Sequence, residues 1–104
     1  MQITLCLLVT ITLTGDTGAT TTTVNFSGSN KVIVQAITAT VIDASGMTAA
    51  ASGTTFSMGA AAVGVTSIKG SPGADTLVGD AKSTIEGGAG NDNITGGSGN
   101  DTLH

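Results

Sequence analysis

Aromatic and cysteine side chains are nearly missing from this 104-residue chain, which has two phenylalanines, no tyrosine or tryptophan, and one cysteine. A single cysteine excludes an internal disulfide, so paired thiols do not hold the fold together. A compact globule of this length normally buries several large side chains, and this chain has few to bury. The sequence therefore argues against an ordinary globular core.

Charged residues are also scarce, at 10% of the chain. Intrinsically disordered chains are usually rich in charge, so this composition argues against ordinary disorder. The sixteen glycines, together with many alanines, threonines and serines, instead suit a thin, regular β structure in which small residues stack in rows. We therefore predict an all-β, repeat-built fold.

The whole net charge of −4 lies in the last third of the chain. Residues 1–69 contain two aspartates and two lysines, whereas residues 70–104 contain four aspartates and one glutamate against Lys82. An acidic, glycine-rich segment is a poor surface for nucleic acid and a suitable one for a hard cation. The sequence therefore predicts a cation as a partner of this segment, and no nucleic acid.

An apolar run, MQITLCLLVTITL, opens the chain over residues 1–13. It has no basic residue at its start, as a signal peptide would, and Thr10 and Thr12 interrupt its apolar residues. The run is also too short and too rich in threonine to span a bilayer. We expect a buried β-strand here, with Cys6 as a small buried filler, and no transmembrane segment.

Bursts of Thr, Val and Ile, separated by Gly, Ser, Asn and Asp, continue as far as Ile68 and predict short strands. The expected strands are Ile3–Thr14, Thr22–Phe26, Lys31–Ala36, Ala39–Ile42, Thr54–Ser57 and Gly64–Ile68. Turn signals fall at 14–18, 27–30 and 44–46, and the alanine-rich stretch 47–52 is of marginal length for a helical turn. This spacing suits a β-solenoid or a sandwich, and residues 1–68 alone do not decide between them.

After residue 67 the large apolar residues recur at a nearly constant spacing. They are Ile68, Leu77, Ile85, Ile94 and Leu103, at intervals of 9, 8, 9 and 9 residues. Such a period is typical of a solenoid in which two units form a coil of about eighteen residues. Each apolar residue then points inward and stacks on the residue two units away, and adjacent coils pair in parallel about 4.8 Å apart.

The same segment repeats the pattern GGxGxDxUx, where U is a large apolar residue. Residues 87–95 (GGAGNDNIT) and 96–104 (GGSGNDTLH) match it fully, and residues 70–78 (GSPGADTLV) lose only the second glycine, to Ser71. Residues 79–86 are one residue short and have Ser83 in place of the aspartate. The glycines allow positive φ and aim backbone carbonyls at one point, and the aspartate adds a carboxylate. Such oxygen-only ligation suits calcium.

Because units alternate between two sides, each turn should stack on the turn two units later. Asp75 and Asp92 would then share one ion, whereas Asp101 has no matching aspartate unless Asp80 reaches in. The predicted calcium ligands are the carboxylates of Asp75, Asp92 and Asp101 and the backbone at Gly73, Ala74, Gly88, Gly90, Gly97 and Gly99. Asp92 and Asp101 would also face a further coil, so we expect the array to be truncated at its C-terminus.

The interior of this repeat segment offers about one large residue in nine, too little to offset a chain entropy of roughly 1–2 kcal/mol per residue. We therefore expect residues 70–104 to fold only when calcium is bound. The predicted fold is an all-β parallel solenoid, Thr/Ala/Gly-rich over residues 1–68, that continues into a calcium-binding β-roll over residues 69–104.

The repeats over about residues 70–104 resemble those of hemolysin-type (RTX) calcium-binding proteins. Residues 41–58 (VIDASGMTAAASGTTFSM), which run directly into the repeats, are similar to RTX-containing bacterial surface-layer proteins. This resemblance implies an extracellular location at the bacterial cell surface, type I secretion without an N-terminal signal, and calcium-driven folding and assembly. This chain shows neither a cell-anchoring region nor a C-terminal secretion segment, so self-assembly and contact with cell-surface components are expectations for a parent protein.

Signals for catalysis are weak. Asp16 stands in the D-T-G triplet of aspartic proteases, but no partner motif follows it, so we expect a turn there. Neither H-E-x-x-H nor G-x-S-x-G occurs, and we expect no enzyme activity. The leading hypothesis is a calcium-binding structural segment of a secreted bacterial surface protein, S-layer-like or adhesin-like. The alternative is the calcium-binding C-terminal tail of a secreted RTX protease or lipase that lacks its catalytic domain.

Overall fold

A computed structural model describes residues 2–5, 9–12, 23–29, 31–36, 39–48 and 54–104. In these parts of the chain every regular element is a strand. The strands are β1 (Gln2–Leu5), β2 (Val9–Thr12), β3 (Thr23–Gly28), β4 (Val32–Ala36), β5 (Val41–Met47), β6 (Thr54–Met58), β7 (Ser67–Lys69), β8 (Ala74–Val78), β9 (Thr84–Glu86), β10 (Asn93–Thr95) and β11 (Thr102–Leu103). No helix long and apolar enough to cross a membrane occurs among the described residues.

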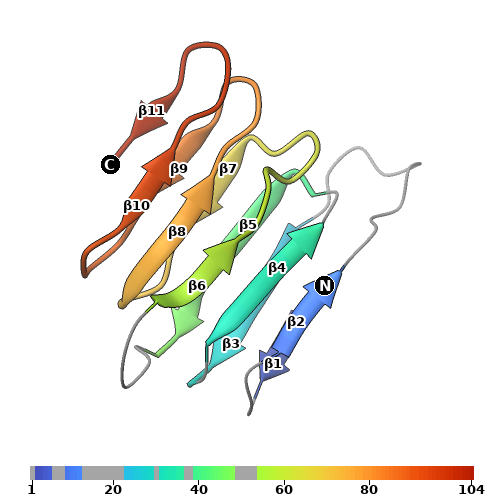
Figure 1. Ribbon diagram of the computed structural model, residues 1–104, viewed down its shortest axis with the longest axis vertical. Coiled ribbons are helices and arrows are strands. Elements are labelled where there is room, and N and C mark those ends of the chain that lie inside the picture. The colour runs from blue at the N-terminus through green and yellow to red at the C-terminus, as the bar shows by residue number, and fades with distance from the viewer. Residues whose placement is uncertain (1, 6–8, 13–22, 30, 37–38, 49–53) are drawn as a thin grey trace.

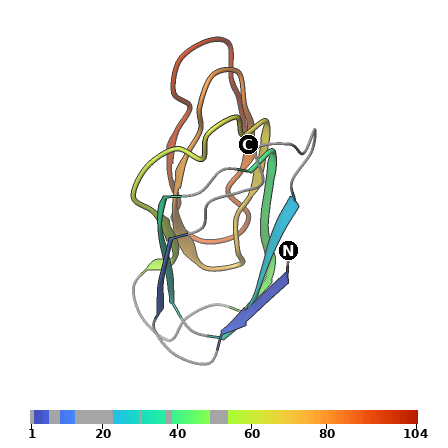
Figure 2. The same cartoon turned by 90° about the vertical axis from the view of Figure 1, so that its right-hand side faces the viewer.

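The strands form two parallel sheets, and the chain alternates between them. One sheet has the order β1-β3-β5-β7-β9-β11 and the other the order β10-β8-β6-β4-β2. Figure 1 shows the coils stacked from the N-terminal strands to β11, and Figure 2 shows the two sheets facing each other as two layers. A β-sandwich has antiparallel sheets, so this topology settles the earlier alternative in favour of the predicted parallel solenoid.

The apolar run at the start of the chain contains two strands, so the single strand predicted over residues 3–14 is wrong. β1 pairs with β3 in one sheet, and β2 pairs with β4 in the other. The longest described strand has seven residues, so a thirteen-residue run is long enough to supply strands to both sheets. Cys6, the turn signals at 14–18 with Asp16, and most of the alanine-rich stretch lie outside the described residues.

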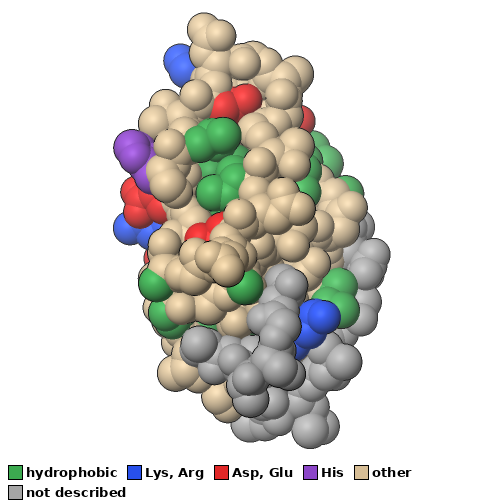
Figure 3. All heavy atoms as spheres, turned by 60° about the vertical axis from the view of Figure 1, so that its left-hand side comes forward, with side chains coloured by type: hydrophobic (Ala, Val, Ile, Leu, Met, Phe, Trp, Pro, Cys, Tyr) green, Lys and Arg blue, Asp and Glu red, His purple; other side chains and the backbone are tan. Residues whose placement is uncertain are grey.

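The core lies between the sheets, and its two aromatic side chains belong to the coils before the repeats. Phe26 on β3 and Phe56 on β6 meet there with ring centroids 4.9 Å apart. Small and medium apolar side chains fill the rest of the core. The surface in Figure 3 is mostly uncharged, and its acidic side chains lie in the upper half, which the C-terminal coils occupy in Figure 1. The structure therefore keeps the charge asymmetry seen in the sequence.

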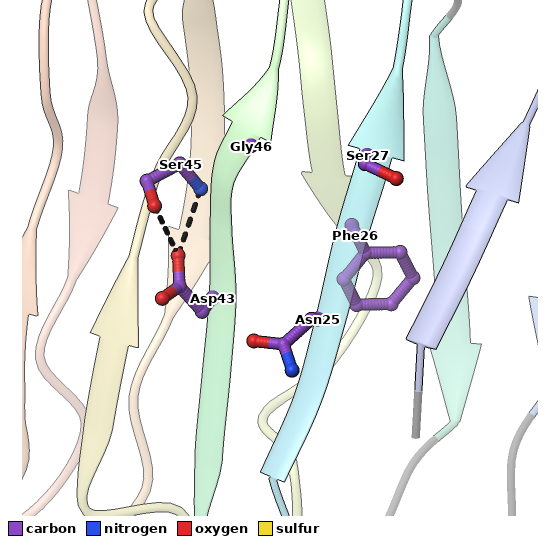
Figure 4. A pocket seen from close by; sticks show the side chains of 6 residues that line it. All are labelled: Asn25, Phe26, Ser27, Asp43, Ser45 and Gly46. Carbon is purple, nitrogen blue, oxygen red and sulfur yellow. Dashed lines mark hydrogen bonds between the residues drawn. The ribbon is translucent and has the colours of Figure 1, made fainter.

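Residues 44–46, predicted as a turn, lie inside β5. The Asp43 Oδ1 atom accepts a hydrogen bond from the Ser45 backbone N–H at 2.9 Å, a contact typical of turns (Figure 4). However, Ala44 is fully buried and the strand continues through Gly46, with a shift of pairing register against β3. A β-bulge at this register shift accommodates the hydrogen bond between Ser45 and Asp43 within the strand. A hollow of about 210 Å³ lies at the same place, lined by Asn25, Phe26, Ser27, Asp43, Ser45 and Gly46.

The large apolar residues of the C-terminal coils stack as their spacing predicted. Ile68 pairs with Ile85, and Ile85 pairs in turn with Leu103. In the other sheet Leu77 pairs with Ile94. The earlier coils vary more in length, because 23 residues separate Gln2 from its partner Asn25, 18 separate Val24 from Ile42, and 26 separate Ile42 from Ile68. Parallel pairing is therefore maintained along the stack, whereas the length of the connections is not.

Ile68→Val should lower the free energy of unfolding by about 0.5–1.5 kcal/mol, because it removes one methylene from a side chain with no solvent exposure. Denaturant titration in saturating calcium measures this loss. Val63→Ala is the matched control, since Val63 is 64% exposed and should change stability by no more than about 0.5 kcal/mol. Equal losses in the two variants would contradict the inward stacking of Ile68.

Candidate calcium site

The four repeat turns lie in two stacks, one on each side of the roll. Residues 70–73 and 87–92 connect the first sheet to the second, and residues 79–83 and 96–101 connect the second sheet back to the first. Thr76 pairs with Asn93, and Thr84 pairs with Thr102. Each turn therefore stacks on the turn two units later, which confirms the predicted arrangement of the units.

The two turns that match the repeat fully share one backbone conformation. In turn 87–92 the φ angles of Gly88 and Gly90 are 95° and 102°, and in turn 96–101 those of Gly97 and Gly99 are 92° and 95°. Only glycine takes this region without strain, which is why the repeat requires it at these positions. The equivalent glycine of the first unit, Gly73, does not have a positive φ.

On the side of turns 70–73 and 87–92, carbonyl and carboxylate oxygens lie close to three glycine positions. A Cβ added to Gly88 would lie 2.5 Å from the carbonyl oxygen of Ser71, and one added to Gly90 would lie 3.0 Å from that of Gly73. A Cβ on Gly87 would collide with Asp92 Oδ2. The absence of side chains at these three glycines therefore leaves room for two carbonyl oxygens and one carboxylate oxygen. A hollow of about 230 Å³ opens beside these turns, lined by Ser45, Gly70, Ser71, Pro72, Gly88 and Ala89.

The opposite side repeats this arrangement. A Cβ on Gly97 would meet the carbonyl oxygen of Asp80 and lie 2.6 Å from that of Gly79. A Cβ on Gly96 would lie 2.7 Å from Asp101 Oδ2. Gly99 instead faces the backbone nitrogen of Lys82, at 3.1 Å from its added Cβ. This side again offers two carbonyls and one carboxylate oxygen around glycine positions.

Asp92 and Asp101 are held in the same way by the preceding coil. Asp92 Oδ1 accepts a hydrogen bond from the Asp75 backbone N–H at 3.0 Å, and Asp101 Oδ1 accepts one from the Ser83 backbone N–H at 2.7 Å. Among the described residues, no hydrogen bond is recorded to the Oδ2 atom of either aspartate. Each carboxylate therefore keeps one oxygen turned toward the first glycine of its own turn.

Asp75 has a different environment, because it is only 2% exposed. Its Oδ2 accepts a hydrogen bond from the Ser71 N–H at 2.7 Å, and its Oδ1 accepts one from the Ser71 hydroxyl at 2.6 Å and one from the Phe56 N–H at 3.0 Å. Burial raises the pKa of the Asp75 carboxyl above its ordinary value, although the bonds from Ser71 and Phe56 lower it, and the Asp92 carboxylate raises it further.

Asp80, the possible second carboxylate beside Asp101, has a side chain that is directed toward Gly64 and not toward Asp101. Asp80 Oδ2 accepts a hydrogen bond from the backbone N–H of Gly64 at 3.0 Å, so it contacts the preceding loop. Only its backbone carbonyl faces Gly97. Ser83, buried and aligned with Asp101, occupies the position of the missing aspartate.

The available donors fit calcium. Carboxylate and carbonyl oxygens are the ligands that this ion prefers, and no group of three or more His, Cys, Asp or Glu side chains gathers within the described parts of the chain. We therefore predict that backbone carbonyls supply most of the ligands. The sequence also predicted the backbone of Gly73 and Ala74 as ligands. The Gly73 carbonyl faces Gly90, and Ala74 begins β8. Their role as ligands stays a prediction.

Sequence reasoning missed the partners of Asp75 and the contacts of Ser83. Ser71, the main partner of Asp75, and Ser83 both stand at positions where their unit departs from the repeat pattern. The departures from the pattern were therefore the signal that could have identified them. The Phe56 N–H gave no signal, because it comes from a strand 19 residues away and outside the repeats.

A family model described as the RTX calcium-binding nonapeptide repeat (4 copies) matches residues 64–82 and 82–104. Searches of curated proteins and of solved structures returned no match. The matched residues contain all four stacked turns, and they include the glycine positions beside which carboxylate and carbonyl oxygens lie. The C-terminal part of the chain, residues 64–104, is therefore a calcium-binding β-roll built of RTX nonapeptide repeats.

Proposed function

We propose that the chain is a non-enzymatic, calcium-dependent structural segment of a secreted bacterial surface protein, S-layer-like or adhesin-like. The observation that supports this proposal is the continuity of the two sheets. β7 pairs with β5 of the earlier coils on one side and with β9 of the repeats on the other. Such continuity favours a single continuous stack over a calcium-binding tail attached to a separate catalytic domain.

Calcium would be held between stacked turns by Asp92 and Asp101 together with the carbonyls of Ser71, Gly73, Gly79 and Asp80. When bound, the ion supplies positive charge between coils whose small interior gives little hydrophobic stabilisation. A site that binds only the folded chain adds about 2.7 kcal/mol when calcium is at one hundred times its Kd. Extracellular calcium modules bind at about 10⁻⁴–10⁻³ M, which suits folding after secretion.

Calcium titration of the full chain tests the proposal. We expect the β signal in circular dichroism to rise at millimolar calcium, and sedimentation velocity and electron microscopy to show ordered self-association above the same concentration. Equal concentrations of magnesium serve as the control, because the smaller ion demands near-ideal octahedral geometry. A monomer with the same β signal in calcium and in chelator would contradict the proposal, and calcium-dependent peptide or ester hydrolysis would favour the hydrolase alternative.

A further inference from the structure

Two buried serines replace residues of the repeat in the coil formed by residues 70–86. Ser71 stands at the second glycine of its unit, and Ser83 stands at the aspartate position, with 1% and 3% exposure. We propose that this coil folds without calcium, because the serine hydroxyls satisfy its turns in place of an ion, and that it templates the calcium-dependent coil 87–104. This inference rests on the proposed function, and it confines the calcium dependence expected from the sequence for residues 70–104 to residues 87–104.

Donors from Ser71 and Phe56 reach both oxygens of the Asp75 carboxylate. Three donors reach its two oxygens, at 2.6, 2.7 and 3.0 Å, and two of these donors belong to Ser71. The Ser71 hydroxyl oxygen also accepts a hydrogen bond from the Gly73 N–H at 3.2 Å, so the same side chain orders the turn. A buried carboxylate with this set of donors does not require a cation to be stable.

On the opposite side, the uncharged hydroxyl of Ser83 orders the turn through hydrogen bonds within the protein. Its hydroxyl donates to the carbonyl oxygen of Val65 at 3.3 Å and accepts from the backbone N–H of Asp80 at 3.2 Å. An aspartate at this position would add a second carboxylate beside Asp101. The hydroxyl removes that repulsion and closes the turn with protein contacts alone.

The backbone separates the same two classes of turn. Each turn of residues 87–104 has two glycines in the left-handed region, whereas in residues 70–86 the only positive φ is that of Lys82, at 50°. Ser71 and Pro72 occupy part of the first turn, and neither residue type readily adopts a positive φ. The first coil therefore lacks the paired glycine conformation found in both turns of the second.

The first coil also orients the carboxylates of the second. The N–H groups of Asp75 and Ser83 are the donors that hold Asp92 and Asp101. Both donors belong to residues that are themselves buried and hydrogen-bonded. A folded coil 70–86 thus presents two fixed N–H groups on which the next coil can assemble.

Hydrogen–deuterium exchange of the full chain tests the boundary. In excess chelator we expect backbone amides of residues 70–86 to stay protected and those of residues 87–104 to exchange freely. Calcium should then protect residues 87–104. If calcium fails to protect residues 87–104, both the proposed function and the template are overturned. If residues 70–86 and 87–104 gain protection together, only the template is overturned.

Ser71→Ala tests the role of the hydroxyl. Loss of one of three donors to a buried carboxylate should speed exchange of residues 70–78 in chelator by about ten- to hundredfold. Ser98→Ala is the matched control, since Ser98 is an exposed serine in another repeat turn and should change exchange by less than about twofold. Equal behaviour of the two variants would overturn the inference.

Ser83→Asp restores the repeat and should make the turn at residues 79–83 depend on calcium. The aspartate cannot donate the hydrogen bond that the Ser83 hydroxyl makes to the Val65 carbonyl, and it buries a charge, so exchange of residues 79–86 in chelator should rise by about tenfold or more, and calcium should reverse the rise. Exchange that stays slow in chelator would show that the serine is not what frees this turn from calcium.

Discussion

Asp92→Asn should abolish calcium-induced folding of residues 87–104 at calcium concentrations that saturate the wild-type chain. Asparagine keeps the shape and can still accept the hydrogen bond from the Asp75 N–H, but it removes the negative charge at the oxygen that faces Gly87. If affinity falls tenfold, the stabilisation from a site at one hundred times its original Kd drops from about 2.7 to about 1.4 kcal/mol. We expect a larger fall, because few carboxylates serve these turns.

Calorimetric titration and circular dichroism on the same samples measure both the affinity and the folding response. Asp43→Asn is the matched control, since Asp43 is an aspartate on β5, outside the nonapeptide units, and its Oδ1 bonds to Ser45. The control should bind calcium like the wild type. Unchanged affinity in Asp92→Asn would remove this residue from the predicted ligands.

Gly97→Ala should prevent the last unit from stacking on the roll. The added Cβ would collide with the carbonyl of Asp80 and lie 2.6 Å from the carbonyl oxygen of Gly79, and these backbone atoms cannot move aside as a flexible side chain would. The φ of 92° adds a backbone strain of about 1–3 kcal/mol. We expect weaker calcium binding and loss of protection over residues 96–104, measured by calorimetry and hydrogen exchange.

Gly64→Ala distinguishes the steric collision expected in Gly97→Ala from the backbone strain that both variants share. Gly64 also has a positive φ, of 76°, but a Cβ there would meet no atom within 4 Å. This variant should lose stability through backbone strain alone and keep the calcium affinity of the wild type. If both alanine variants bind calcium equally well, close stacking at Gly97 is not required for the site.

The repeat period allowed much of the C-terminal coils to be predicted. Ile68, Ile85 and Leu103 recur after 17 and 18 residues, and this nearly constant spacing has one simple explanation, a stack of parallel strands with these residues in register. The earlier coils were harder to predict, since their connections differ in length. There the division of the first apolar run between two sheets, and the bulge in β5, depended on pairing partners far away in the sequence.

The candidate site divides in the same way. The stacking of turn 87–92 on the first turn followed from counting residues, because register and spacing are linked in a solenoid. The hydrogen bonds of Asp75 and Asp80 did not follow, since their partners Phe56 and Gly64 belong to no repeat unit. A local motif predicts the contacts between its own repeated residues, but it does not predict contacts with residues that are distant in the sequence.

The alternation of the chain between two sheets restricts how such a protein can change its length. Removing one nonapeptide from the middle would transfer every later strand to the opposite sheet, and every later turn to the opposite side of the roll. Removing two would return each strand to its original face, because one complete circuit of the chain separates paired residues such as Ile85 and Leu103. Duplication and loss in pairs of units is therefore the step that leaves the remaining architecture intact.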